Sequence, residues 1–325
     1  MNYLITGGAG FIGSHLTASL LAGGDEVFII DDLSTGKREN LKTLAGNPGL
    51  HLFIDSVTNE ALVSDLVGRC EVIFHLAAVV GVRLVAENPL SVLKTNIYGT
   101  ECVYASAAKF DRKVILTSSS EVYGRSEEVP LKEDGPLVFD MSSTTWSYAF
   151  SKIIDEFLAL KFHREKDLPV VITRLFNVVG PGQVADYGMV IPRFMQQAAS
   201  GGPIIVYDDG SQTRSFTFVG DVVEALIQLS KCDEAAGEIF NIGSEEPISI
   251  NELAEKVRRL VNPAAQIKRI PFSNVFGSGK ADIRHRVPDI SKIKRTVGFK
   301  PTLSIDGILQ KILEDLKKTG RIQDD

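Results

Sequence analysis

The sequence has few cysteines and no excess of positive charge. Its three cysteines stand far apart in 325 residues, at Cys70, Cys102 and Cys232. This excludes a cysteine-based zinc cluster or a disulfide framework, and predicts reduced thiols that fill the core. The chain has 35 basic and 41 acidic residues and a net charge of −6, so nothing indicates a surface for nucleic acid or membrane lipid. We therefore expect no metal site and no nucleic-acid or membrane partner.

Long hydrophobic runs are also absent. No stretch approaches the apolar length of a membrane-spanning helix, and the chain enters a strand pattern at once, without the features of a signal peptide. We therefore expect a cytoplasmic protein. Its length is sufficient for a full hydrophobic core in one large domain or two smaller ones.

The first thirteen residues, MNYLITGGAGFIG, carry the strongest local signal. A short apolar strand pattern turns directly into a helical pattern over residues 14–22 through four glycines, Gly7, Gly8, Gly10 and Gly13. Glycines at such a turn let a pyrophosphate approach the backbone, and let the helix direct its N-terminal N–H groups at the phosphate. The pattern predicts a dinucleotide site.

A carboxylate stands where such a site needs one. The second strand pattern ends at Asp31, about twenty residues after the glycines. A carboxylate there suits the two hydroxyls of a ribose and repels a 2′-phosphate, so the sequence favours NAD over NADP. Further alternation of strand and helix patterns predicts an α/β, doubly wound parallel Rossmann sheet. Ala77 follows the fourth strand and is small enough for a cofactor to lie against it, whereas we expect His75 to be a structural residue satisfied by its neighbours.

Two groups of polar residues predict chemistry. The strand over residues 113–117 ends in three serines and Glu121, and its carboxyl end faces the cofactor crevice of a doubly wound sheet. A serine-rich turn that only caps the strand is the alternative. Tyr148 and Lys152 lie four residues apart on a predicted helix over 147–165, so they share a face. A nearby ammonium lowers the pKa of a phenol, so the pair can take a proton from an alcohol while a hydride leaves its carbon.

Seven stretches of the sequence resemble the extended short-chain dehydrogenases/reductases, specifically the nucleotide-sugar epimerase/dehydratase family. They follow the family's order over most of the chain: TGGAGFIGSHL, DDLSTGKREN, HLAA, TSSSEVYG, YAFSK, RLFNVVGPG and GSQTRSFTFVGDVVEAL. The resemblance implies NAD as cofactor, a UDP-linked nucleotide-sugar substrate, and a homodimer formed by the helices over 89–109 and 147–165. It also implies an NAD-binding domain over 1–176 that receives about 215–243, and a smaller, discontinuous sugar-nucleotide-binding domain made of 177–214 and 244–325.

The resemblance also implies individual roles. Tyr148 removes the sugar hydroxyl proton, Lys152 holds the nicotinamide ribose and Ser119 hydrogen-bonds the reacting oxygen, with Glu121 as a further catalytic group. The implied NAD contacts are Gly7, Gly10, Phe11, Ile12, Gly13, Asp31, Asp32, Ser56, Ala77 and Lys152. The implied substrate contacts are Asn96, Ser120, Asn177, Arg214 and Arg284, the last in an Arg-His-Arg run that could equally be a solvated face. Relatives usually carry an aspartate where this chain has Ser56, so the adenine contact is open between Asp55 and Ser56.

Three reactions fit, all beginning with oxidation at sugar C4. We rank a UDP-hexose or UDP-hexuronate 4-epimerase first, because HLAAVVGVRLVAENP and DDLSTGKREN resemble the epimerase form. A UDP-glucuronate decarboxylase is second, because the Ser119-Ser120-Glu121 run resembles those enzymes. Arg83 could receive a hexuronate carboxylate or could equally face solvent. A 4,6-dehydratase is third, because Ser120 replaces its usual aspartate. A non-catalytic NAD-binding protein is disfavoured by the intact triad.

Overall fold

The computed structural model describes residues 1–80, 89–140, 146–185, 189–271 and 284–322. Its larger part is built on a seven-stranded sheet whose neighbouring strands are all parallel, in the order β11-β6-β5-β4-β1-β2-β3. The strand order reverses between β1 and β4, which is where doubly wound sheets bind ligands. The predicted fold class is confirmed. The strands are β1 (Asn2–Thr6), β2 (Glu26–Ile30), β3 (Leu50–Phe53), β4 (Val72–His75), β5 (Lys113–Ser119), β6 (Val170–Leu175) and β11 (Ile239–Ile242).

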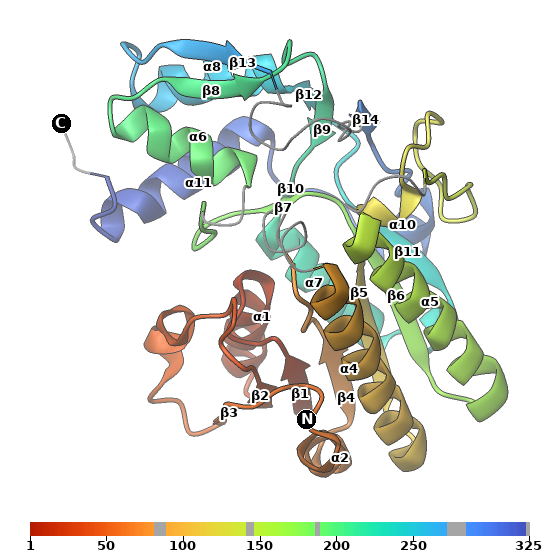
Figure 1. The fold of residues 1–325 in the computed structure, drawn as a ribbon. Coiled ribbons are helices and arrows are strands. Elements are labelled where there is room, and N and C mark those ends of the chain that lie inside the picture. Colours follow the sequence, from red (N-terminus) through yellow and green to blue (C-terminus); the bar gives the residue numbers. More distant parts are fainter. Residues whose placement is uncertain (81–88, 141–145, 186–188, 272–283, 323–325) are drawn as a thin grey trace.

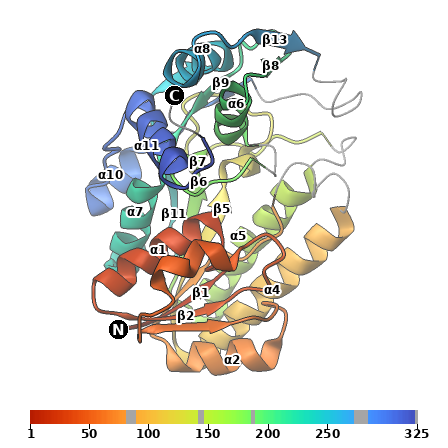
Figure 2. The ribbon, with the colours of Figure 1, turned by 90° about the vertical axis from the view of Figure 1, so that its left-hand side faces the viewer.

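Helices cover both faces of this sheet (Figures 1 and 2). Strand side chains alternate between the faces: Tyr3 and Ile5 belong to one hydrophobic core, and Leu4 between them belongs to the other. Because both faces are covered, the strands read as continuous apolar runs. Burying a side chain such as Leu4 contributes about 1.5–3 kcal/mol. One face carries α1 (Phe11–Ala22), α7 (Val219–Lys231) and α10 (Ser291–Val297), and the other carries α2 (Glu60–Arg69), α4 (Pro89–Phe110) and α5 (Ser147–Lys166).

A smaller part lies above the sheet in Figure 1 and has its own hydrophobic core. Its helices are α6 (Val190–Ala199), α8 (Ile250–Val261) and α11 (Ile305–Lys318). It also contains two small sheets. In one, β8 (Ile204–Tyr207) pairs with β13 (Ile267–Ile270). The other has three strands in the order β12 (Pro247–Ser249), β9 (Thr213–Ser215) and β14 (His285–Arg286). A further pair, β7 (Val178–Val179) and β10 (Thr217–Phe218), lies at the crossing between the two parts.

Residues 213–218 form two short strands, β9 and β10, and Phe216 between them is buried in the core of the smaller part. One predicted boundary differs from the structure. Helix α1 begins at Phe11 rather than Ser14, since Gly10 caps it. Three short 3-10 helices complete the description: η1 (Arg38–Leu44), η2 (Ser120–Tyr123) and η4 (Asp233–Ala235).

All three cysteines are free thiols. Cys70 and Cys102 fill the core on the α2 side of the sheet, as predicted, and burial raises the pKa of the Cys70 thiol to about 12. Within the described ranges, no helix combines the length and apolar character needed to cross a bilayer. The same part of the chain holds no cluster of histidine, cysteine or acidic side chains suited to a metal ion.

Candidate active site

The glycine turn between β1 and α1 is built so that only glycine fits at its key positions. Gly7 has a φ of +73°, and a Cβ there would lie 2.8 Å from the Ala77 nitrogen. A Cβ on Gly13 would lie 2.3 Å from the Gly7 carbonyl oxygen. The close packing keeps the N-terminus of α1 beside the end of β1, the arrangement that binds a pyrophosphate. The remaining predicted contacts near this turn are the half-buried Phe11, Ile12 and Ala77 and the exposed Asp32.

Asp31 follows directly after β2 and is buried. Its Oδ2 accepts a hydrogen bond from the Ala9 N–H and its Oδ1 accepts one from the Leu33 N–H, both at 2.9 Å. Burial raises the pKa of this carboxyl, and the two backbone hydrogen bonds oppose that shift. Each carboxylate oxygen has two acceptor positions, so Asp31 can still accept hydrogen bonds from ribose hydroxyls. The turn and this carboxylate fit NAD.

The two candidates for the adenine contact are tied to one another. The Ser56 N–H donates to Asp55 Oδ1 at 2.7 Å, and Asp55 Oδ2 accepts from the Asn59 amide at 2.9 Å. The Ser56 hydroxyl shares a hydrogen bond of 2.8 Å with Thr58. Both residues shape the turn after β3, and an adenine contact by either stays a prediction.

The end of β5 brings the predicted catalytic groups together. Ser119 accepts a hydrogen bond from the Glu121 N–H at 3.2 Å, which starts η2. Ser119 and Glu121 are both close enough to act on the pKa of the Tyr148 phenol. Burial, and then Glu121, raise the pKa of Tyr148, while the hydrogen bond with Ser119 opposes them. The predicted lowering of this pKa by Lys152 is therefore not seen in this structure.

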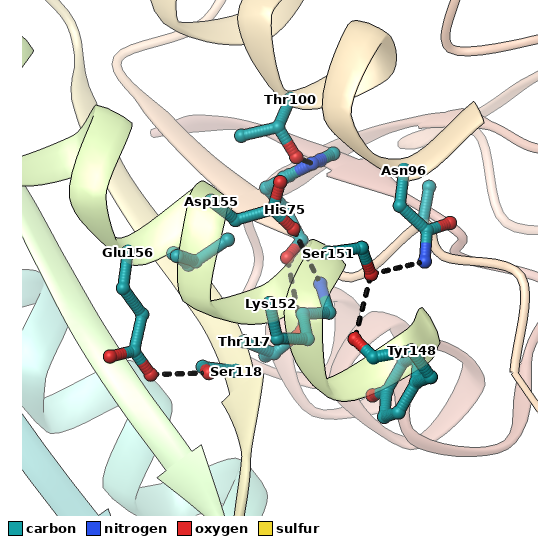
Figure 3. A network of polar contacts seen from close by, with 12 residues as sticks. His75, Asn96, Thr100, Thr117, Ser118, Tyr148, Ser151, Lys152, Asp155 and Glu156 are labelled. Carbon is teal, nitrogen blue, oxygen red and sulfur yellow. Dashed lines mark hydrogen bonds and ion pairs between the residues drawn. The ribbon is translucent and has the colours of Figure 1, made fainter. Parts of the chain in front are cut away.

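Lys152 has a different partner. Its ammonium donates to Asp155 Oδ2 at 3.3 Å, and the side chains of both residues are buried on α5 (Figure 3). Asp155 is also among the groups that raise the pKa of Tyr148. The positive charge of Lys152 is thus compensated within the helix, and the sequence analysis did not foresee this carboxylate.

Asn96 links α4 to the start of α5. Its Oδ1 accepts from the Val79 N–H at 2.7 Å, and its amide donates to the Ser151 hydroxyl at 3.0 Å. Ser151 in turn donates to the Tyr148 carbonyl oxygen at 2.8 Å (Figure 3). These bonds hold the loop after β4 against α5, the helix that carries Tyr148 and Lys152. A direct contact between Asn96 and substrate stays a prediction.

Arginines from the smaller part approach the same edge. Strands β9 and β14 pair so that Arg214 lies beside Arg286, and the guanidinium of Arg286 donates from Nη1 to the Ser120 hydroxyl at 3.4 Å. Arg284 is exposed, so Arg286 is the member of the Arg-His-Arg run that reaches the end of β5. A two-residue strand has too short a pattern to indicate which of the two would do so. Arg83 lies outside the described residues.

Asn177 lies where β6 leads into the smaller part. It adopts a φ of +35°, and its amide donates to the Ser215 carbonyl oxygen at 2.8 Å. Asn177 thereby joins the end of the large sheet to β9, the strand that carries Arg214. Asn177 and Arg214, two of the predicted substrate contacts, are on adjoining segments, and their binding role stays a prediction.

Comparisons with known proteins identify the family of this chain. The family model described as GDP-mannose 4,6 dehydratase matches residues 4–312. The chain is 39% identical over 312 residues to UDP-N-acetyl-alpha-D-glucosaminuronate decarboxylase of Bacillus cytotoxicus, covering 96% of each chain. It is 36% identical over 318 residues to UDP-glucuronic acid decarboxylase 1 of Arabidopsis thaliana, covering 98% of this chain and 70% of that one.

A solved structure shares the whole architecture. UDP-glucuronic acid 4-epimerase from Bacillus cereus, in complex with UDP-glucuronic acid and NAD, superposes with a TM-score of 0.88 at 28% identity, covering 98% of this chain and 100% of that one. The glycine turn, the end of β5 and the tyrosine-lysine helix therefore occur within a match that spans almost the full chain. This chain belongs to the extended short-chain dehydrogenase/reductase family of NAD-dependent nucleotide-sugar epimerases, dehydratases and decarboxylases.

Proposed function

We propose that this protein is an NAD-dependent UDP-hexuronate decarboxylase, with a UDP-hexuronate 4-epimerase as the second candidate. The observation that carries the proposal is the contact between Arg286 and Ser120, next to Glu121 at the end of β5. It brings a guanidinium, the best partner for a carboxylate, to the strand end that carries the catalytic serine. The similarity to two decarboxylases of UDP-linked uronic acids supports the same choice. The sequence ranking placed the epimerase first, so this is a change of order.

The first step is oxidation of the sugar at C4. When bound, NAD supplies the acceptor for the C4 hydride and can return it later. Tyr148 as phenolate takes the proton of the C4 hydroxyl, and Ser119 hydrogen-bonds the same oxygen. Lys152 follows Tyr148 by one helical turn, where its ammonium can bind the nicotinamide ribose. Because the Tyr148 pKa is raised in this structure, we expect the oxidation to be faster at alkaline pH.

The second step is loss of the carboxylate. Once C4 is a ketone, the C6 carboxylate is attached to the carbon next to it, so the intermediate is a β-keto acid. The C5–C6 bond breaks, carbon dioxide leaves, and the electron pair moves into an enolate across C4 and C5. Arg286 and Ser120 bind the carboxylate before it leaves, and Glu121 is the nearby group that can deliver a proton to C5. An epimerase would omit this step and keep all carbons.

The diphosphate of the substrate has its own proposed ligands. Arg214 lies on β9 beside Arg286, and Asn177 is hydrogen-bonded to the last residue of that strand. Guanidinium groups suit diphosphate oxygens because their donors are planar and paired. Arg284 is exposed on the segment that leads into β14, so we assign it a peripheral role at most.

We also propose a homodimer formed by α4 and α5. These helices pack together along one side of the molecule (Figures 1 and 2). They expose large apolar side chains: Leu90 is 80% exposed, Phe157 59% and Ile154 38%. Exposed apolar groups gathered on two adjacent helices are characteristic of a protein interface. A second copy of the chain would cover them.

The reaction can be tested by proton NMR of the purified protein with NAD, incubated with UDP-glucuronate and with UDP-N-acetylglucosaminuronate in separate tubes. We expect a UDP-linked pentose or 4-keto pentose from at least one tube, and no conversion by Tyr148→Phe. A galacto-configured hexuronate with C6 retained would make the protein an epimerase. Glu121→Gln separates the steps: we expect it to form NADH, seen by absorbance, while formation of the pentose product, which needs protonation at C5, slows by about 10²-fold or more.

A further inference from the structure

We infer that Asp155 is a positioning residue for the reaction, which holds the Lys152 ammonium and limits its effect on Tyr148. The inference rests on the proposed function only in taking Tyr148 as the acid/base. It assigns a role to a carboxylate outside the serine, tyrosine and lysine triad. The argument comes from burial, hydrogen bonding and the charges around these groups.

The first observation is the burial of an ion pair. The side chains of Lys152 and Asp155 are 2% and 0% exposed, and the ammonium lies 3.3 Å from Oδ2. Two charges buried together lose much of their hydration, so such a pair is retained at a cost that a hydrophobic pair would avoid. A pair of this kind one turn from an acid/base tyrosine calls for a functional explanation.

The second observation is a chain of polar groups, among them Thr100 and His75, that leads away from the carboxylate of Asp155 (Figure 3). Burial raises the pKa of Asp155, and Lys152 and the Thr100 hydroxyl on α4 oppose that shift. Its Oδ1 lacks a hydrogen bond of standard geometry among the described residues. Thr100 also shares a 2.9 Å hydrogen bond with His75 Nε2. His75 Nδ1 is 2.8 Å from the Thr6 hydroxyl, which accepts from the Ala77 N–H at 3.1 Å.

One arrangement of protons satisfies this whole chain. Thr6 accepts from the Ala77 backbone and donates to His75 Nδ1, so the ring carries its proton on Nε2 and donates it to Thr100. Thr100 is then free to donate toward Asp155. His75 stays neutral, because complete burial and the charge of Lys152 lower its pKa to about 3. The predicted structural role of His75 thus extends from the end of β1, next to the glycine turn, to the catalytic lysine.

The third observation is the set of charges that act on Tyr148. Glu121 from η2 and Asp155 from α5 both raise the pKa of the phenol, and Ser119 from β5 opposes them. Asp155 itself is faced by Lys152, Thr100 and the like-charged Glu156. Because its carboxylate compensates the ammonium, removing that charge while keeping the shape leaves Lys152 to act on the phenol alone. The phenolate would then form at a lower pH.

The test compares Asp155→Asn with the wild-type enzyme loaded with NAD. The amide keeps the size and can still accept a hydrogen bond from Lys152, but it has no charge. We expect the midpoint of the rise of kcat with pH to fall by about 1 unit, since a nearby charge shifts a pKa by 1–3 units. The Tyr148 phenolate is also titrated directly by ultraviolet difference absorbance, using Tyr148→Phe in each background as the blank.

Two further variants complete the design. Asp65→Asn changes the exposed Arg69–Asp65 pair on α2, and we expect it to leave the midpoint unchanged. Thr100→Val weakens the support of the charged carboxylate without altering Asp155, so we expect a smaller shift in the same direction. If Asp155→Asn does not fold, the shift of the Tyr148 midpoint in Thr100→Val tests the inference in its place.

An unchanged or raised Tyr148 midpoint in every folded variant overturns the inference. The absorbance titration needs no turnover, so it reports on Asp155 even if the sugar substrate is wrong. Conversely, full activity of Tyr148→Phe would refute the proposed function while leaving the titration result for Asp155 intact. A loss of stability without a midpoint shift would mean that Asp155 is structural only.

Discussion

The ion pair between Arg174 on β6 and Glu156 on α5 makes a strong prediction about stability. Their side chains are 4% and 6% exposed. Arg174 donates from Nε to both carboxylate oxygens at 3.0 and 3.2 Å, and from Nη2 to Oε2 at 2.8 Å. The Ser118 hydroxyl, directly before the proposed catalytic Ser119, donates to the same carboxylate at 2.5 Å. We expect Glu156→Gln to leave the guanidinium buried without a charged partner.

The size of the effect follows from the contacts. Breaking a buried pair by neutralising one partner costs about 3–5 kcal/mol. Arg174 keeps two contacts, a hydrogen bond of 3.0 Å to the Glu133 carbonyl oxygen and the face of the Tyr123 ring, whose centroid is 4.8 Å away. We therefore expect Glu156→Gln to lower the free energy of unfolding by about 3 kcal/mol, the lower end of this range.

The assay is urea unfolding of the wild type, Glu156→Gln, Arg174→Met and the double variant. We expect the double variant to be less destabilised than the sum of the single variants by about 2 kcal/mol, because the two groups interact directly. The matched control is Glu255→Gln, which breaks a partly exposed pair with Arg258 that also has two N–H···O contacts, and should cost about 0–1 kcal/mol. If Glu156→Gln costs no more than this control, the reasoning from burial is refuted.

Three further predictions concern the glycine turn, His75 and the proposed dimer. Gly13→Ala should abolish NAD binding in a calorimetric titration, because its Cβ would lie 2.3 Å from the Gly7 carbonyl oxygen; wild-type affinity would contradict this. The pKa of His75 is lowered from 6.5 to about 3, so unfolding takes up a proton between these values. The free energy of unfolding should therefore fall by about 1.4 kcal/mol per pH unit as the pH drops from 6.5 to about 3. Urea unfolding at several pH values should show this loss for the wild type and not for His75→Gln. Phe157→Glu should convert a dimer into monomers in sedimentation, and unchanged mass would remove α5 from the interface.

The fold was predictable because its signals are local and strong. The glycine turn, Asp31 after a strand and the alternation of strand and helix patterns indicate a doubly wound sheet, and all are present. The buried strands are apolar throughout, since helices cover both faces. The tyrosine-lysine spacing needed only the geometry of one helical turn.

The smaller part was harder to predict because several of its strands are too short to show an alternation of apolar and polar residues. Strands β12 and β14 have three and two residues, so no alternation marks them. Only their pairing with β9 shows that Arg286 and not Arg284 reaches Ser120. Asp155 was missed although it lies three residues after Lys152 on the same helix, a spacing that brings side chains together. The spacing does not reveal that the pair is buried, because that burial comes from the packing of α5 in the fold.

The direct test of the account is release of carbon dioxide from UDP-glucuronate labelled with ¹³C at C6, measured with the purified protein and NAD. The proposed decarboxylase gives labelled bicarbonate in step with a UDP-linked pentose product, and Tyr148→Phe gives none. If UDP-glucuronate and labelled UDP-N-acetylglucosaminuronate are both converted with the label fully retained in the sugar, the protein is not a decarboxylase and the role given to Arg286 is wrong.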